Sequence, residues 1–461
     1  MSELHELMAV GPLDGRYAGR VQELGEITSE FGLMKYRVTV EAEWLRTLAG
    51  GILPDVTPFS EEADQTVRGL ADGFTPEDAL RIKEIEKTTK HDVKAVEMWM
   101  RERLQKAGGF DNYLELIHFG RTSEDINNLA YAMMLRDVRD GVLLPQIDAI
   151  GEDLETKAHE YASMPLLAKT HGQPAIPTTL GKEMAVFVER LSGSARSIGE
   201  VAILGKFNGA VGTYGAESVA YSDVNWQEVN QSFVEGLGFT FNPVTTQIEP
   251  HDYMARFLNE VALANNILED LATDMWQYIS DGVFLQKVVE DEVSSSTMPH
   301  KVNPIDFENA EANFGLANAL AEFLARKLPK SRLQRDLSDS SAQRAFGEVF
   351  GHTLVALKSL KKGLGKVKPN EPQMAEDLAN EWSVLGEAVQ TVMRRYGVDD
   401  AYNIIKVATR GKTLNPDRYH DLVVGLEVPE EVKIDLLKLS PKNYTGKAKE
   451  IALSTRYRHE Q

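Results

Sequence analysis

Apolar residues recur at every third or fourth position over long stretches of this chain, which is the spacing of a helix with one buried face. Proline stands at the start of two such stretches, at Pro76 and Pro304, where it suits the first turn of a helix. Strand signals are sparse, and the best of them, Phe239-Thr240-Phe241, predicts one short hairpin arm. The pattern therefore predicts an all-α fold. The predicted helices cover about residues 25–50, 76–106, 143–161, 184–202, 254–279 and 345–360, and one more begins after Pro304.

The longest stripe lies between Pro250 and the hydroxyl-rich stretch described below, with no internal proline and only Gly282 late in it, which is typical of a helical bundle. Helices of this length cannot be covered within one monomer of this size, so we expect the bundle to be shared between subunits. A chain of 461 residues should divide into two to four domains. We expect three: an N-terminal helical domain over 1–111, a central long-helix bundle over 112–364, and a C-terminal domain of shorter amphipathic helices over 365–461.

Composition and charge narrow the class of function. The formal net charge is -20, and such a surface repels nucleic acid and anionic membranes, so we expect neither as a partner. No apolar run is long enough to span a bilayer and the first residues do not form a signal peptide, so we expect a cytoplasmic location. The chain has no cysteine, which excludes a disulfide, a thiolate metal site and a cysteine nucleophile. An anionic substrate would need its own cluster of Arg and Lys against this field.

The stretch from Ser294 to Asn313 combines a hydroxyl-rich segment, a cation and the start of a helix. Consecutive hydroxyl residues compete for backbone hydrogen bonds and disfavour a helix, whereas Pro304 suits a first turn. Helix N-termini attract anions. Composition alone favours a flexible surface loop that ends in an ordinary helix cap.

The order of residues in this stretch is more specific than its composition. Ser295-Ser296-Thr297-Met298-Pro299-His300-Lys301-Val302-Asn303-Pro304 resembles the signature of the fumarase/aspartase superfamily, with Ser294 where the family usually has glycine. The resemblance implies a loop that closes over a dicarboxylate and supplies the base for a β-elimination that releases fumarate.

Such an elimination removes a proton from a carbon beside a carboxylate and protonates the leaving nitrogen on the opposite side. A base must lie within reach of the carbon, and preorganised donors must stabilise the developing charge, but neither a metal nor an organic cofactor is required. Histidine titrates near neutral pH, which makes His171 a candidate acid. Ser295 is a candidate base only if Lys301 or a helix N-terminus activates its hydroxyl.

Polar and cationic side chains that could bind an anionic substrate occur elsewhere in the chain. The side chains suited to binding a carboxylate are those of Thr122, Ser123, Lys301 and Asn303. The planar guanidinium fork of arginine suits phosphate binding, and arginine recurs at Arg332, Arg335 and Arg344. Runs of Arg and Asp are more often ion-paired surface, and Thr122 or Ser123 is in any case a good helix N-cap.

Taken together, residues 11–449 resemble the bacterial branch of the adenylosuccinate lyase family. The matching strings are Asp14-Gly15-Arg16-Tyr17, His91-Asp92-Val93-Lys94-Ala95-Val96-Glu97, Thr122-Ser123-Glu124-Asp125-Ile126-Asn127-Asn128, Thr170-His171-Gly172-Gln173-Pro174-Ala175, Thr246-Gln247-Ile248-Glu249-Pro250-His251-Asp252, the signature, and Gln334-Arg335-Asp336.

This resemblance implies a homotetramer whose active sites are each built from three subunits, with no metal and no cofactor. It implies cleavage of adenylosuccinate to AMP and fumarate, and the same elimination on succinylaminoimidazole carboxamide ribotide. It implies His171 as general acid and Ser295 as general base. The nucleotide would be held by Arg16, Tyr17, Arg335, Ser340 and Arg344. The succinyl part would be held by Lys90, His91, Asp92, Thr122, Ser123, Gln247, Lys301 and Asn303.

Two alternatives remain open from the sequence. The first is another fumarate-releasing lyase of the superfamily, such as argininosuccinate lyase, fumarase or aspartase; the strings around Gln247 and Arg335 match the nucleotide branch and argue against it. The second is a catalytically inactive structural tetramer, because the same fold serves as a lens protein in some animals. The presence of the candidate acid, the candidate base and Lys301 argues against that reading.

Overall fold

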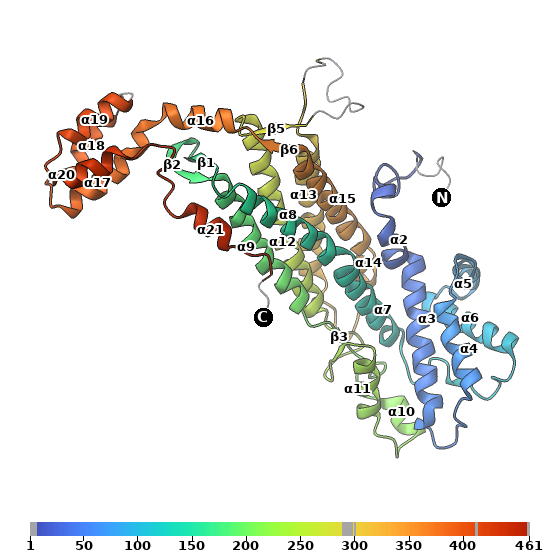
Figure 1. Ribbon diagram of the computed structural model, residues 1–461. Coiled ribbons are helices and arrows are strands. Elements are labelled where there is room, and N and C mark those ends of the chain that lie inside the picture. The colour runs from blue at the N-terminus through green and yellow to red at the C-terminus, as the bar shows by residue number, and fades with distance from the viewer. Residues whose placement is uncertain (1–6, 288–297, 299–300, 411–413, 459–461) are drawn as a thin grey trace. The chain divides into compact units, whose positions relative to one another are not determined.

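A computed structural model describes residues 7–287, 298, 301–410 and 414–458. Helices dominate the described chain, as predicted, and its few strands form two-stranded sheets (Figure 1). The chain divides into two compact units that are each assembled from three segments. Unit 1 comprises Met1–Gln146, Ala195–Asn266 and Ala312–Lys358, and unit 2 comprises Ile147–Ser194, Ile267–Glu311 and Ser359–Gln461. The division into three domains at 111/112 and 364/365 stays a prediction.

Five long helices contain the boundaries between the segments of the two units. They are α8 (Leu144–Glu160), α9 (Leu180–Glu200), α12 (Asp252–Ser280), α13 (Ile305–Lys327) and α15 (Phe346–Lys366). Each was predicted from its apolar stripe or from Pro304. Within unit 1, Asn265 of α12 donates to Asn318 of α13 at 3.0 Å and to Thr353 of α15 at 3.1 Å. These buried amides and the hydroxyl satisfy one another, so these three helices are fixed in register.

The remaining elements of unit 1 are mostly short helices. They are η1 (Ala18–Arg20), α2 (Gln22–Thr28), α3 (Glu30–Thr47), η2 (Leu48–Ile52), α4 (Glu61–Asp72), α5 (Pro76–Thr89), α6 (Asp92–Ala107), η3 (Leu114–Leu116), α7 (Ser123–Val138), η4 (Arg139–Leu143), β3 (Leu204–Gly205), α10 (Gly215–Ala220), α11 (Trp226–Gly236), β4 (Thr240–Phe241) and α14 (Ser338–Gln343). Trp44 of α3 anchors this core, with its ring 4.9 Å from that of Phe207 and 5.3 Å from that of Phe233.

Two predictions for unit 1 are corrected. The single helix predicted over 76–106 is two helices, because Lys90 is left-handed at φ 55° and ends α5 while His91 caps α6. The helix predicted over 25–50 is interrupted at its start by Ser29, whose hydroxyl accepts the Gly32 amide and begins α3. Neither break is marked by proline, so the apolar spacing alone hid both.

Unit 2 adds a β-hairpin, a small sheet and a set of short C-terminal helices. They are β1 (Pro165–Thr170), β2 (Gln173–Thr179), β5 (Phe284–Gln286), β6 (Val367–Pro369), α16 (Glu371–Asn380), η5 (Trp382–Leu385), α17 (Gly386–Arg395), α18 (Ala401–Thr409), α19 (Pro416–Val424), α20 (Glu430–Leu437) and α21 (Ala448–Ser454). Leu385, Val389, Met393, Tyr419 and Val423 belong to one buried cluster of the C-terminal helices. The short amphipathic helices predicted after residue 365 are therefore confirmed.

The strands differ from prediction in two places. No strand was predicted between the helices at 143–161 and 184–202, but the antiparallel pair β1–β2 lies there. The predicted strand at 239–241 exists as β4, but it pairs in parallel with β3 instead of forming a hairpin arm. Of the described helices, none is both long enough and apolar enough to cross a membrane.

Candidate active site

The N-terminus of α7 is the centre of a polar network in unit 1. Thr122 is the N-cap of α7, as predicted, and Asp125 in the first turn accepts the Thr122 amide at 2.9 Å. Glu124 is buried beside it, and its Oε1 accepts hydrogen bonds from Asn127 at 2.8 Å and from Arg335 at 2.7 Å. A buried carboxylate is stable only when it is paired and hydrogen-bonded, and both conditions are met for Glu124.

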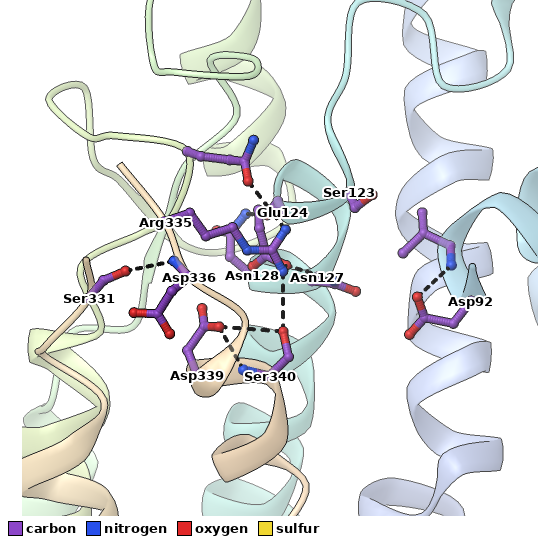
Figure 2. A network of polar contacts seen from close by, with 12 residues as sticks. Asp92, Ser123, Glu124, Asn127, Asn128, Ser331, Arg335, Asp336, Asp339 and Ser340 are labelled. Carbon is purple, nitrogen blue, oxygen red and sulfur yellow. Dashed lines mark hydrogen bonds and ion pairs between the residues drawn. The ribbon is translucent and has the colours of Figure 1, made fainter. Parts of the chain in front are cut away.

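Arg335 joins three segments of unit 1 through its guanidinium (Figure 2). Besides Glu124, it donates to Gln247 Oε1 at 3.2 Å and to Ser340 Oγ at 3.2 Å. Its buried Nε has no hydrogen-bond partner among the described residues. A guanidinium has five N–H groups and three are used here, so this fixed fork keeps donors for an oxygen of a bound anion.

The same network extends to Arg37 and Arg344, which both contact Asp92 at the start of α6. Arg37 of α3 donates to Asn127 Oδ1 at 2.8 Å and pairs with Asp92 Oδ2 at 2.8 Å. Arg344 Nη2 lies 3.6 Å from the same Asp92 oxygen. Burial disfavours the charged form of Asp92, but the charge of Arg37 outweighs it and holds the pKa of that carboxyl below its usual value. A continuous chain of contacts therefore links Arg344 to Arg335.

His91 and Ser123 lie on the edge of this network. Nδ1 of His91 accepts the Lys94 amide at 3.2 Å, which leaves the proton of a neutral ring on Nε2. That Nε2 lies 3.4 Å from Ser123 Oγ. The contact places the N-cap of α6 beside the first residue of α7, so the predicted succinyl-binding residues of these two helices share one place in the fold.

Arg16 and Tyr17 lie in an N-terminal turn. The Pro12 carbonyl accepts the Gly15 amide at 3.3 Å and the Tyr17 amide at 2.8 Å. A cavity of about 590 Å³ is lined by this turn, by the start of α3 and by Arg344. The cavity therefore connects the turn to the cation at the end of the polar network.

The candidate acid lies at the tip of a hairpin in unit 2. His171 and Gly172 have φ values of 54° and 73°, and Thr170 pairs with Gln173 across them. Positive φ at both central residues is the type I′ turn, which fits the twist of two antiparallel strands. The imidazole of His171 is exposed at this tip, and the turn rather than packing fixes its backbone.

The structure brings some of the predicted site residues together and leaves others apart. Unit 1 brings together Asp92, His91, Ser123, Gln247, Arg335, Ser340 and Arg344, with Thr122 at the start of α7. Exposed Lys90 and Arg16 take no part in the hydrogen bonds described above. Lys301 is exposed and Asn303 half-buried just before α13, and both belong to unit 2 with His171. Ser294, Ser295 and His300 lie outside the described residues.

Sequence reasoning missed three members of the network. Glu124 and Asn127 stood in a matching string, but only a capping role was inferred for the acids there. Arg37 was missed altogether, and its one signal was a charged residue inside a largely apolar helix pattern. Among the described residues, no three His, Asp or Glu side chains converge as metal ligands would.

Comparison with known proteins identifies two family models and several close relatives. A family model described as lyase matches residues 15–317, and one described as adenylosuccinate lyase C-terminal matches residues 331–445. The chain is 47% identical over 450 residues to an adenylosuccinate lyase of Haemophilus influenzae, covering 97% of this chain and 99% of that protein. It is also 47% identical over 447 residues to that of Escherichia coli K12, covering 97% and 98%.

Solved structures support the fold. A fumarate lyase from Mesorhizobium sp. BNC1 matches with a TM-score of 0.76 at 21% identity, over 94% of this chain and 96% of that one. A 3-carboxy-cis,cis-muconate lactonizing enzyme from Pseudomonas putida matches with a TM-score of 0.74 at 20% identity, over 98% and 97%. Because the close relatives extend over nearly the whole chain, this protein belongs to the adenylosuccinate lyase family.

Proposed function

We propose that the chain cleaves adenylosuccinate to AMP and fumarate and performs the same elimination on succinylaminoimidazole carboxamide ribotide, in purine nucleotide biosynthesis. The observation that carries the proposal is the position of Arg335, held by Glu124, Gln247 and Ser340 with its Nε left over. Both substrates have a phosphate and a succinyl group, so one anion site and one dicarboxylate site serve both reactions.

In this proposal the nucleotide is held by cations at the two ends of the polar network. Arg335 and Ser340 bind at one end and Arg344 at the other, with Arg16 and Tyr17 supplied by the N-terminal turn. The network stabilises this arrangement in an acidic protein, because Glu124 and Asp92 hold Arg335 and Arg344 in place while the ligand is absent. Planar donors that are already oriented lose little entropy when an anion binds.

The succinyl part is held by polar and cationic side chains that include two hydroxyls, two amides and two lysines. Residues proposed for this are Lys90, His91, Asp92, Thr122, Ser123, Gln247, Lys301 and Asn303. Removing a proton beside a carboxylate creates a dianionic intermediate, and donors aimed at that carboxylate typically contribute about 10²–10³ in rate each. Elimination moves no electrons to or from an external acceptor, so the proposal includes no metal and no organic cofactor.

The proton transfers are assigned to His171 and Ser295. His171 gives a proton to the leaving nitrogen while Ser295 takes one from the carbon, so the C–N bond breaks as the C=C bond of fumarate forms. Positioned acids and bases of this kind contribute about 10²–10⁴ each. Ser295 becomes a competent base only with a nearby cation, and Lys301 follows it by six positions in the chain.

We further propose that the chain acts as a homotetramer with sites shared between subunits, in the cytoplasm. Large apolar side chains remain exposed on the long helices: Val186 on α9, Leu263 and Trp276 on α12, and Leu316 and Phe323 on α13. Apolar side chains in such number on bundle helices indicate a surface that another copy covers.

A single assay tests the function. Purified protein is mixed with adenylosuccinate, and absorbance in the ultraviolet follows the release of AMP and fumarate. Turnover that is lost in Ser295→Ala and in His171→Ala supports the reaction and the two roles. Turnover that both variants retain would show the roles to be wrong. Turnover of argininosuccinate but not of adenylosuccinate would overturn the choice of substrate.

A further inference from the structure

A fully buried histidine stands between two carboxylates beside the proposed nucleotide site. His251 is 0% exposed, Glu249 is 1% exposed and Asp339 is 2% exposed. Its Nε2 lies 3.5 Å from Asp339 Oδ2 and its Nδ1 lies 3.9 Å from Glu249 Oε2. No reaction step proposed above uses this group, although a buried imidazole between two acids is costly to maintain without a reason.

The backbone of His251 is held in an unfavourable conformation. Its φ is 66°, which is left-handed, and it directly precedes α12. Its amide donates to Glu249 Oε2 at 2.7 Å, which fixes the turn. Glycine or asparagine adopts this conformation at less cost than histidine. A histidine here is therefore better explained by what its ring contacts than by the turn it occupies.

The contact partner of His251 leads directly to Arg335. Oδ1 of Asp339 accepts the Ser340 amide at 2.7 Å and lies 3.5 Å from Ser340 Oγ, and that hydroxyl accepts from Arg335 Nη2 at 3.2 Å (Figure 2). The two oxygens of one carboxylate thus face His251 on one side and the Ser340 turn on the other. Any change in the position of Asp339 moves both Ser340 and the Arg335 fork.

We propose that His251 is a positioning residue for nucleotide binding, which holds Asp339 and through it Ser340 and Arg335 in the geometry that receives the phosphate. The inference rests on the proposed function, because it assigns the phosphate to these residues. His251 touches neither the substrate nor the reacting atoms. Its effect passes through Asp339 alone.

Charge gives this contact a second consequence. Asp339 stands next to the place where an anionic phosphate would bind, and an uncompensated carboxylate there would repel it. His251 supplies a compensating donor on the side away from Ser340. Burial disfavours ionisation of Asp339, but the contact with His251 and the Ser340 amide outweigh it and hold the pKa of Asp339 below its usual value. The carboxylate can therefore organise Ser340 without repelling the ligand.

Two substitutions of His251 separate positioning from folding. Asparagine tolerates the left-handed backbone but reaches only as far as the Nδ1 side of the ring, so His251→Asn loses the contact with Asp339. Glutamine places an amide donor at about the reach of Nε2, so His251→Gln keeps that contact. We expect His251→Asn to weaken AMP binding about 10- to 100-fold and His251→Gln to restore it to within about threefold.

The measurement compares the two products on the intact protein. AMP and fumarate inhibition constants are determined for wild type and both variants, with the unfolding midpoint recorded for each. A selective loss of AMP affinity in His251→Asn, with fumarate affinity within about twofold of wild type, supports the inference. Equal losses for AMP and fumarate, or no loss for AMP, overturn it.

A variant on the other side of the contact covers the case in which His251→Asn does not fold. Asp339→Asn keeps only one of the two acceptor oxygens that face His251 and the Ser340 amide. We expect this lost contact to outweigh the removed negative charge, so that AMP binding is weakened and fumarate binding is spared. The double variant should bind AMP no more weakly than the worse single variant, because both substitutions break one contact. Additive losses overturn the inference. If wild type cleaves adenylosuccinate and Asp339→Asn keeps full AMP affinity, only the inference is overturned. If wild type binds no AMP, the proposed function is overturned as well.

Discussion

Lys206 Nζ lies 2.8 Å from Asp125 Oδ1, and both side chains are 0% exposed. The other two ammonium protons of Lys206 are used as well, by the carbonyl oxygens of Gly209 and Gln247 at 2.9 Å each. Burial disfavours the charged form of Asp125, but the charges of Lys206 and Arg121 outweigh it and hold the pKa of that carboxyl below its usual value. The ion pair thus ties the N-terminus of α7 to the backbone of Gln247, which contacts Arg335.

Removing one partner of this pair should destabilise the protein strongly. We expect Lys206→Met to lower the free energy of unfolding by about 3–5 kcal/mol, because Asp125 stays fully buried and loses its ion-pair partner. Unfolding in urea, followed by circular dichroism, measures the loss. Adding Asp125→Asn should recover part of it, since the amide oxygen can still accept backbone donors and no buried charge remains. An equally large loss for the control Lys438→Met, which breaks an exposed pair with Asp435, would contradict this explanation.

His118 gives the stability a dependence on pH near neutrality. Its Nδ1 lies 2.6 Å from Glu41 Oε1 and its Nε2 lies 3.7 Å from Glu97 Oε1, with Asp125 also contributing charge. Burial lowers the pKa of His118, but these carboxylates outweigh burial and raise it above its usual value of 6.5. The stabilisation is therefore fully present below about pH 6.5 and is lost as the pH rises through the raised pKa.

The comparison of wild type with His118→Gln measures this effect. We expect the unfolding midpoint of wild type to exceed that of the variant by the largest margin near about pH 6, and by a smaller margin near about pH 9. His420→Gln, which removes an exposed imidazole, is the matched control for the loss of a histidine side chain. A margin for His118→Gln that grows with pH would reverse the sign of the argument.

The parts of the fold that could be predicted are those with a local cause. Helix α12 is 29 residues long and has an apolar stripe, so its type and its great length could be predicted from the spacing of apolar residues. The break at Lys90 was not, because a lysine in a left-handed conformation has no composition signal comparable to that of glycine. The pairing of β4 with β3 joins segments 36 residues apart, 204 with 240, and no local pattern specifies a partner at that distance.

The candidate site also has residues that could be predicted from the local sequence and residues that could not. Strings that match the adenylosuccinate lyase family contain Arg335 and Gln247, and the resemblance also implied Ser340. The structure places Arg335 in contact with both of the others. Arg37 could not be found from its own segment, because its partner Asp92 lies 55 positions away and only the fold brings the two together. The link from His251 to Asp339 spans 88 positions and was missed for the same reason.

Exposed apolar residues on α13 allow a test of the proposed tetramer. Leu316 is 52% exposed and Phe323 is 50% exposed, and their spacing of seven places them on one face of the helix. We expect wild type to have a mass of about four times 51.3 kDa by light scattering, and Leu316→Asp/Phe323→Asp to give smaller species. Activity should fall by more than about tenfold in the variant if sites are shared between subunits. Val407→Asp, at a position on α18 that is 67% exposed, should leave the mass unchanged. A wild-type monomer would contradict the proposal.

The turn that carries His171 allows its acid role to be tested without disturbing the hairpin. Asparagine is among the residues best suited to positive φ in a type I′ turn, so His171→Asn should leave the unfolding midpoint unchanged. It removes the proton donor, and we expect kcat to fall by about 10²–10⁴. Gly172→Ala is the complementary change, because φ is 73° there while no neighbouring atom crowds the site. It should cost about 1 kcal/mol of stability through backbone strain and spare most of the activity. If His171→Asn kept turnover within about threefold of wild type, the leaving nitrogen would have to receive its proton from another group.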